Sequence, residues 1–127
     1  EMKRLWTAAA LLIALLGFTL FHSFYLSRFS NELTTILHEA EAKAESGHWE
    51  NAQDLTNTAW NKWHSHDAYL HVLLRHSETD EIYIGFREVA EFIQCEEAGE
   101  YSAANARLIA QLELLSEAEQ LTLKNIL

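Results

Sequence analysis

An uncharged stretch of 23 residues, Leu5 to Ser27, lies between Arg4 and Arg28 and limits how this chain can fold. As an α-helix it would extend about 35 Å, enough to cross the hydrocarbon core of a membrane. A core helix of a soluble bundle would carry a polar stripe, whereas residues 8–16 are apolar around the whole circumference. The stretch therefore predicts a membrane-spanning helix.

A cleaved signal peptide is the main alternative, because Lys3 and Arg4 form a short basic region ahead of the apolar run. The run is longer than a signal peptide needs, and bulky residues at 21–25 stand where the small residues of a cleavage site belong. We therefore expect residues 1–27 to remain as an uncleaved, single-pass anchor in the cytoplasmic membrane. The two basic residues predict a cytoplasmic N-terminus and an extracytoplasmic domain over residues 28–127.

The composition of residues 28–127 indicates an acidic, helical domain. These residues carry 7 basic and 18 acidic side chains, a formal charge of −11, which argues against nucleic acid as a partner. The whole chain has no Pro and only four Gly, so it is poor in turn formers and does not resemble a sheet protein. Its single cysteine, Cys95, excludes an intrachain disulfide.

The spacing of apolar residues predicts four helices. The membrane helix should continue directly as the first helix of the domain and end at Ser46-Gly47. A second helix should run from Trp49 to Leu74, with a possible kink at residues 65–67. The apolar phase changes after Leu74, and Ser77 is placed to cap a third helix that ends at Gly99. A fourth should open near Tyr101.

The two expected hairpin turns share a pattern of Glu, Gly, an aromatic residue and Ala, at residues 45–52 and 97–104. The pattern predicts Gly47 and Gly99 as left-handed caps of the preceding helices. Duplication of a hairpin and coincidence both account for the likeness. The predicted fold is all-α: an N-terminal transmembrane helix that continues into a small antiparallel four-helix bundle of two helical hairpins.

Histidine is abundant, with seven in the chain, which raises the possibility of a metal site. Ligands on one helix share a face at a spacing of three or four residues, and His76 with Asp80 and Asp67 with His71 meet this condition. No H-E-x-x-H motif is present. We expect no metal and no cofactor. The alternative is a metal- or ligand-sensing domain that uses the stretch 64–80, with His64 as a further ligand.

Tryptophan is the other unusual concentration. Trp60 and Trp63 lie three residues apart and share a helix face, so a position in the core is the first interpretation. Docking of a partner or contact with the membrane surface is the second. Together with Trp49, His76 and Asp80 they form the candidate interaction or polar cluster. No nucleophile with a base, no glycine-rich phosphate loop and no paired carboxylates stand out, so we expect a protein that is not an enzyme.

The chain resembles a bacterial family of short, single-anchor membrane proteins, catalogued as domain-of-unknown-function family 4363. The likeness rests on the apolar start, the Gly47 to Trp49 turn, Trp60 and Trp63, the segment His76-Ser77-Glu78-Thr79-Asp80-Glu81-Ile82 and the closing Asn125-Ile126-Leu127. The resemblance implies no activity and suggests a larger, polytopic membrane protein as neighbour. We therefore expect an interaction or accessory module for another membrane protein.

Overall fold

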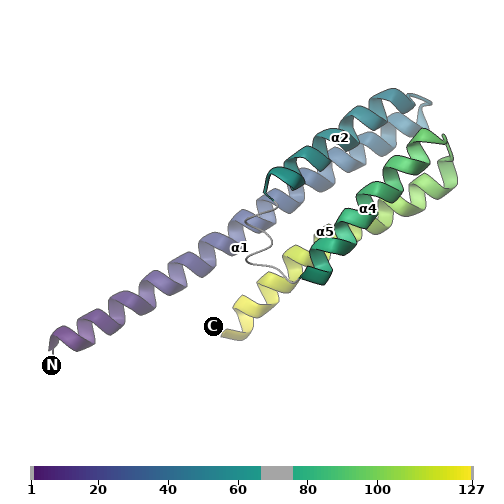
Figure 1. The fold of residues 1–127 in the computed structure, drawn as a ribbon. Helices are drawn as coiled ribbons and strands as arrows, with labels where there is room; N and C mark the ends of the chain where they lie inside the picture. Colours follow the sequence, from purple (N-terminus) through teal and green to yellow (C-terminus); the bar gives the residue numbers. More distant parts are fainter. Residues whose placement is uncertain (1, 67–75, 127) are drawn as a thin grey trace.

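The computed structural model describes residues 2–66 and 76–126, which form four helices and no strand. They are α1 (Met2–Glu45), α2 (Trp49–Ser65), α4 (His76–Gln94) and α5 (Ala98–Ile126). Figure 1 shows two antiparallel hairpins, α1 with α2 and α4 with α5, whose turns lie at the same end of the bundle. The predicted four-helix antiparallel arrangement is confirmed.

α1 is one continuous helix of 44 residues, so the predicted continuation of the apolar helix into the bundle is confirmed. Its N-terminal half projects alone beyond the other helices (Figure 1). Residues 2–21 are exposed except for the half-buried Thr19, and burial starts at His22. These 20 residues cover about 30 Å, the thickness of a bilayer's hydrocarbon core. α1 is the one helix of the described residues that is long and apolar enough to span a membrane.

The bundle core is a stripe of small and branched residues along each helix. Ala40 and Ala44 of α1 and Ala52 and Ala59 of α2 are all buried, and small side chains of this kind allow two helices to approach closely. Trp63 is 2% exposed, and its ring stacks on that of Phe29 at 6.2 Å. The core interpretation of Trp63 is therefore correct.

Two buried polar side chains fix how α5 lies along α1. The Asn105 side chain donates to the Leu37 carbonyl at 3.1 Å and to Glu41 Oε1 at 3.4 Å. The Ser30 hydroxyl donates to the Leu112 carbonyl at 2.7 Å. Because a buried donor without an acceptor is costly, a slip of α5 along α1 would be penalised by the loss of these three bonds. The sequence patterns did not point to either side chain.

The turn between α1 and α2 has the predicted geometry. Gly47 has φ +81°, its N–H donates to the Ala44 carbonyl at 3.0 Å, and the His48 N–H donates to the Lys43 carbonyl at 2.8 Å. This pair of bonds is the Schellman motif, in which a glycine takes the left-handed position without steric penalty. The prediction for Gly47 is confirmed.

The same motif closes α4, but the prediction for its left-handed residue is wrong. Glu96, not Gly99, has positive φ, at +54°, and the N–H groups of Glu96 and Glu97 donate to the carbonyls of Ile93 and Phe92, each at 3.0 Å. Gly99 is instead the second residue of α5. The cause lies in the core, because in both hairpins the left-handed residue stands three positions after the last buried residue, Ala44 or Ile93.

The helix limits also differ from those predicted. α2 ends at Ser65. The Lys62 carbonyl there is bonded by two side chains, the Ser65 hydroxyl at 2.9 Å and the His66 ring Nδ1 at 2.8 Å. The His66 backbone N–H instead donates to the Trp63 carbonyl. A continuing helix would have used that Lys62 carbonyl for the His66 N–H. The expected extension to Leu74 lies outside the described residues. α4 begins at His76, which puts Ser77 inside the first turn rather than at the cap, and α5 begins at Ala98 rather than near Tyr101.

The end of the bundle that carries both turns is closed by aromatic rings. Trp49 lies edge-on to Tyr101, with ring centroids 5.7 Å apart. Tyr101 is 1% exposed, and its hydroxyl has no hydrogen-bond partner within the described part of the chain. Burial, and then the nearby carboxylates of Glu41 and Glu45, raise the pKa of this phenol well above its ordinary value.

Candidate functional site

A cleft of about 270 Å³ lies between α2 and α4, the least closely packed pair of neighbouring helices in the bundle. We call it the Trp60 cleft. Its walls are supplied by three residues of α2 and four of α4, namely Thr56, Asn57, Trp60, Tyr83, Phe86, Arg87 and Ala90. Three of them are Trp, Tyr and Arg, the residue types that most often dominate the binding energy of protein interfaces.

Trp60 is the centre of an aromatic cluster. Its ring lies 5.4 Å from that of Tyr83 and 5.5 Å from that of Phe86, tilted or edge-on to both, and stacks at 5.4 Å on the exposed imidazole of His64. Tilted and edge-on contacts are the preferred geometries of aromatic pairs. Trp60 is therefore held rigidly, although it is only half buried.

Tyr83 and Arg87 form the outer rim of the cleft. They are four residues apart on α4, and Arg87 Nη1 donates to the Tyr83 hydroxyl at 3.1 Å. The guanidinium carbon also lies 5.9 Å from the Tyr83 ring centroid. The hydrogen bond to Tyr83, and then the electrostatic interaction with the same side chain, raise the pKa of Arg87. The carboxylate of Glu91 raises it more weakly. Tyr83 itself is 43% exposed, so this rim faces solvent.

Thr56 is the unusual residue of the cleft. It is 2% exposed, and its hydroxyl has no hydrogen-bond partner among the described residues. A threonine within a helix normally bonds the carbonyl four residues earlier, as Thr58 does with Asp54 at 3.0 Å. A buried hydroxyl left without a partner destabilises a fold by about 1–3 kcal/mol. Thr56 contributes to the wall of the cleft, but its hydroxyl oxygen is itself buried and offers no surface to a bound group.

The residues of the cleft support binding rather than reaction chemistry. Its described lining offers two hydroxyls, an amide and a guanidinium around aromatic rings, with no carboxylate, imidazole or thiol. Such a wall suits an apolar side chain flanked by hydrogen-bond acceptors, to which the exposed Asn57 amide and Arg87 guanidinium can donate.

The structure separates the members of the predicted cluster. Trp60 lines the cleft, Trp63 is in the core, and Trp49 packs against Tyr101 at the turn end, about 16 Å from Trp60 along α2. Asp80 is exposed on the first part of α4. The His76 side chain lies outside the described residues.

The histidine-rich stretch is described only in part. His64 is exposed and stacked on Trp60, while Asp67 and His71 lie outside the described residues. Among the residues that the structure describes, no three His, Cys, Asp or Glu side chains gather in a way that could hold a metal ion.

Sequence reasoning missed Thr56, Tyr83 and Arg87. Thr56 could have been found, because it stands in the buried series Ala52, Thr56, Ala59, where a polar residue requires an explanation. Tyr83 and Arg87 show the spacing of a helical pair, but only the packing of α4 beside α2 places that pair next to Trp60.

No curated protein and no solved structure is significantly similar to the chain. The family model described as Domain of unknown function (DUF4363) matches residues 20–126, a range that starts where the exposed part of α1 ends and includes α2, α4 and α5. Because this match covers most of the chain, the resemblance seen in the sequence is confirmed, and the protein belongs to the DUF4363 family.

Proposed function

We propose that the protein is a single-pass, membrane-anchored helical module that binds another integral membrane protein through the Trp60 cleft, and that it is not an enzyme. The observation that carries the binding role is the half-buried Trp60 ring in a cleft whose rim is the exposed pair Tyr83 and Arg87. Binding of a partner would remove the accessible apolar surface of these rings from water, which stabilises a complex.

The exposed half of α1 supports the membrane anchor. Only 17% of its most apolar stretch is buried, whereas the core helix of a soluble protein would be mostly buried. Cleavage at the end of the apolar run, after His22 or later, would also separate buried residues of α1 from the bundle. Retention of the helix, with Lys3 and Arg4 on the cytoplasmic side, is the topology that the proposal adopts.

The charge of the domain favours a partner of opposite sign. Residues 28–127 carry a formal charge of −11, so a basic surface would be attracted over a distance. Within the cleft, the exposed Arg87 guanidinium and Asn57 amide have N–H groups that can donate to a partner's acceptors. The best fit is an exposed loop or helix end of a membrane protein that inserts one apolar side chain and presents backbone carbonyls beside it.

The proposal is tested by crosslinking in the native membrane. A photoreactive residue at Asn57, which is exposed beside the cleft, should form one discrete adduct with an integral membrane protein identified by mass spectrometry. The adduct should disappear when Trp60→Ala is added. The same residue at Glu113, exposed on α5, is the control. Identical adducts from both positions, or an adduct that survives Trp60→Ala, would exclude the cleft as the binding site.

A further inference from the structure

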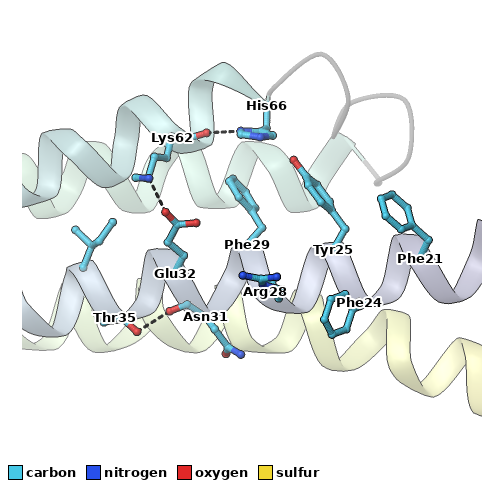
Figure 2. A pocket seen from close by; sticks show the side chains of 11 residues that line it. Phe21, Phe24, Tyr25, Arg28, Phe29, Asn31, Glu32, Thr35, Lys62 and His66 are labelled. Atoms are coloured by element: carbon cyan, nitrogen blue, oxygen red, sulfur yellow. Dashed lines mark hydrogen bonds and ion pairs between the residues drawn. The ribbon is translucent and has the colours of Figure 1, made fainter.

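A second, larger groove lies at the opposite end of the bundle from the turns, where α2 ends beside α1. It has a volume of about 880 Å³, and we call it the membrane-end groove. Its lining starts at Phe21, the last exposed residue before burial of α1 begins. Figure 2 shows side chains of α1 and the end of α2 facing each other across it.

One wall of the groove is aromatic and continues the apolar surface of the membrane helix. Phe21, Tyr25 and Phe29 follow one another at a spacing of four, with ring centroids 6.4 and 6.3 Å apart (Figure 2). Phe21 and Phe24 are 65% and 62% exposed, while Phe29 is buried. His66 covers Phe29 from the α2 side at 4.6 Å. Exposed rings at the end of an apolar span are typical of the membrane interface.

The groove also gathers positive charge on a strongly acidic domain. Arg28 is exposed, and its guanidinium carbon lies 5.9 Å from the Phe24 ring centroid. Lys62 reaches across from α2 and pairs with Glu32 of α1 (Figure 2). Arg28 and Lys62 against Glu32 leave a surplus of one positive charge among these residues, next to the end of the apolar span.

We propose that the membrane-end groove binds an anionic phospholipid from the leaflet next to the bundle. Arg28 offers a planar fork of donors that matches a phosphate, and the Lys62 ammonium has three donors, so it can keep Glu32 and still contact a phosphate. The acyl chains then lie along Phe21 and Phe24. Charge complementarity selects the phosphate, and the continuity of the aromatic wall with the span selects a lipid over a soluble anion.

The inference rests on the proposed membrane anchor, and the experiment separates the two. The full chain is reconstituted in vesicles of phosphatidylcholine with increasing phosphatidylglycerol, and insertion is checked by resistance to alkaline carbonate extraction. Retained lipid is then counted by native mass spectrometry after mild solubilisation. Extraction by carbonate would refute the anchor itself. Insertion without preference for phosphatidylglycerol would refute only the lipid site.

Matched variants test the residues. Arg28→Gln and Lys62→Gln should each weaken the retention of phosphatidylglycerol about fivefold. Lys43→Gln and Arg107→Gln change the net charge equally at exposed positions outside the groove and should leave retention unchanged. Equal losses in both sets would mean that net charge, not the groove, selects the lipid.

Glu32→Gln provides the test with opposite sign. It removes the carboxylate that competes for Lys62, so retention should rise, an effect that a destabilised fold cannot produce. Inorganic phosphate, compared with chloride at matched ionic strength, should not displace the lipid. Displacement by phosphate, or weaker retention in Glu32→Gln, would overturn the assignment.

Discussion

The left-handed residue Glu96 is the most direct place to test the fold. Glu96 has φ +54° at the position that Gly47 occupies, with φ +81°, in the other hairpin. A β-carbon in this conformation destabilises the fold by roughly 1–2 kcal/mol, and replacement by glycine removes this penalty. The larger conformational freedom of glycine in the unfolded chain offsets about 0.5–1 kcal/mol of the gain. Glu96→Gly should therefore stabilise the bundle by about 0.5–1 kcal/mol.

Electrostatics add to this gain. Glu96 stands two residues after the end of α4 and two before the start of α5, so the two helix dipoles act on its charge with opposite sign and the neighbouring carboxylates decide. Carboxylates lie close together in this turn, because a hydrogen bond with Glu100, and then the negative charge of Glu100, raise the pKa of Glu97. Removal of the Glu96 charge should therefore reduce repulsion. Glu96→Ala is the control, because it removes the charge but keeps a β-carbon at positive φ, and it should give only the smaller gain.

Substitution of the two turn glycines by alanine should change the stability of the bundle in opposite directions. Gly47→Ala should destabilise the bundle by about 0.5–1 kcal/mol. Gly99 lies in the first turn of α5, and a β-carbon there would meet nothing within 4 Å, so Gly99→Ala should stabilise by about 0.4–1 kcal/mol. Had Gly99 been the left-handed cap, as the sequence pattern predicts, the sign for Gly99→Ala would be reversed.

The assay is urea and thermal unfolding of the full chain in detergent micelles, followed by near-ultraviolet circular dichroism, which reports the buried Trp63. A change of 1 kcal/mol shifts the melting temperature of a domain of this size by about 4–8 °C. The reasoning is refuted if Glu96→Gly melts no higher than Glu96→Ala, or if Gly99→Ala melts below the parent.

Three further predictions follow from the fold and the proposed topology. The pKa of Tyr101 is raised in the folded state, so the stability that its neutral phenol confers is complete below the unfolded-state pKa of about 10 and is lost as pH rises further. Tyr101→Phe should reduce this loss of stability at alkaline pH in unfolding curves. An unchanged pH profile would contradict the burial argument. A periplasmically active reporter fused after Leu127 should be active, and replacing Lys3 and Arg4 by Glu should weaken that orientation, whereas activity only of a cytoplasmic reporter would reverse the proposed topology. Zinc should not raise the melting temperature, and a dose-dependent rise that disappears in His76→Ala would support the metal-sensing alternative.

Features that depend only on neighbours along the chain follow from the amino-acid sequence. Periodic apolar residues specify helices, and the length of the uncharged run predicts how much of α1 extends beyond the bundle without contact with the other helices. Gly47 predicts its own turn because only glycine takes that conformation without penalty, and Trp63 follows the helical stripe into the core. These are local rules, so they hold without knowledge of the partner helix.

Tertiary structure decided the positions that depend on which helices meet. The left-handed residue is Glu96 because Ile93 is the last residue of α4 that packs in the core. Gly99, three residues after Glu96, cannot change where α4 leaves the core. Thr56, Tyr83 and Arg87 become one cleft only because α4 lies beside α2, and Arg28 and Lys62 share a groove only because α2 ends near the start of the bundle. The sequence contains all of these residues, but their distances are set by helix packing, which no periodicity along a single helix encodes.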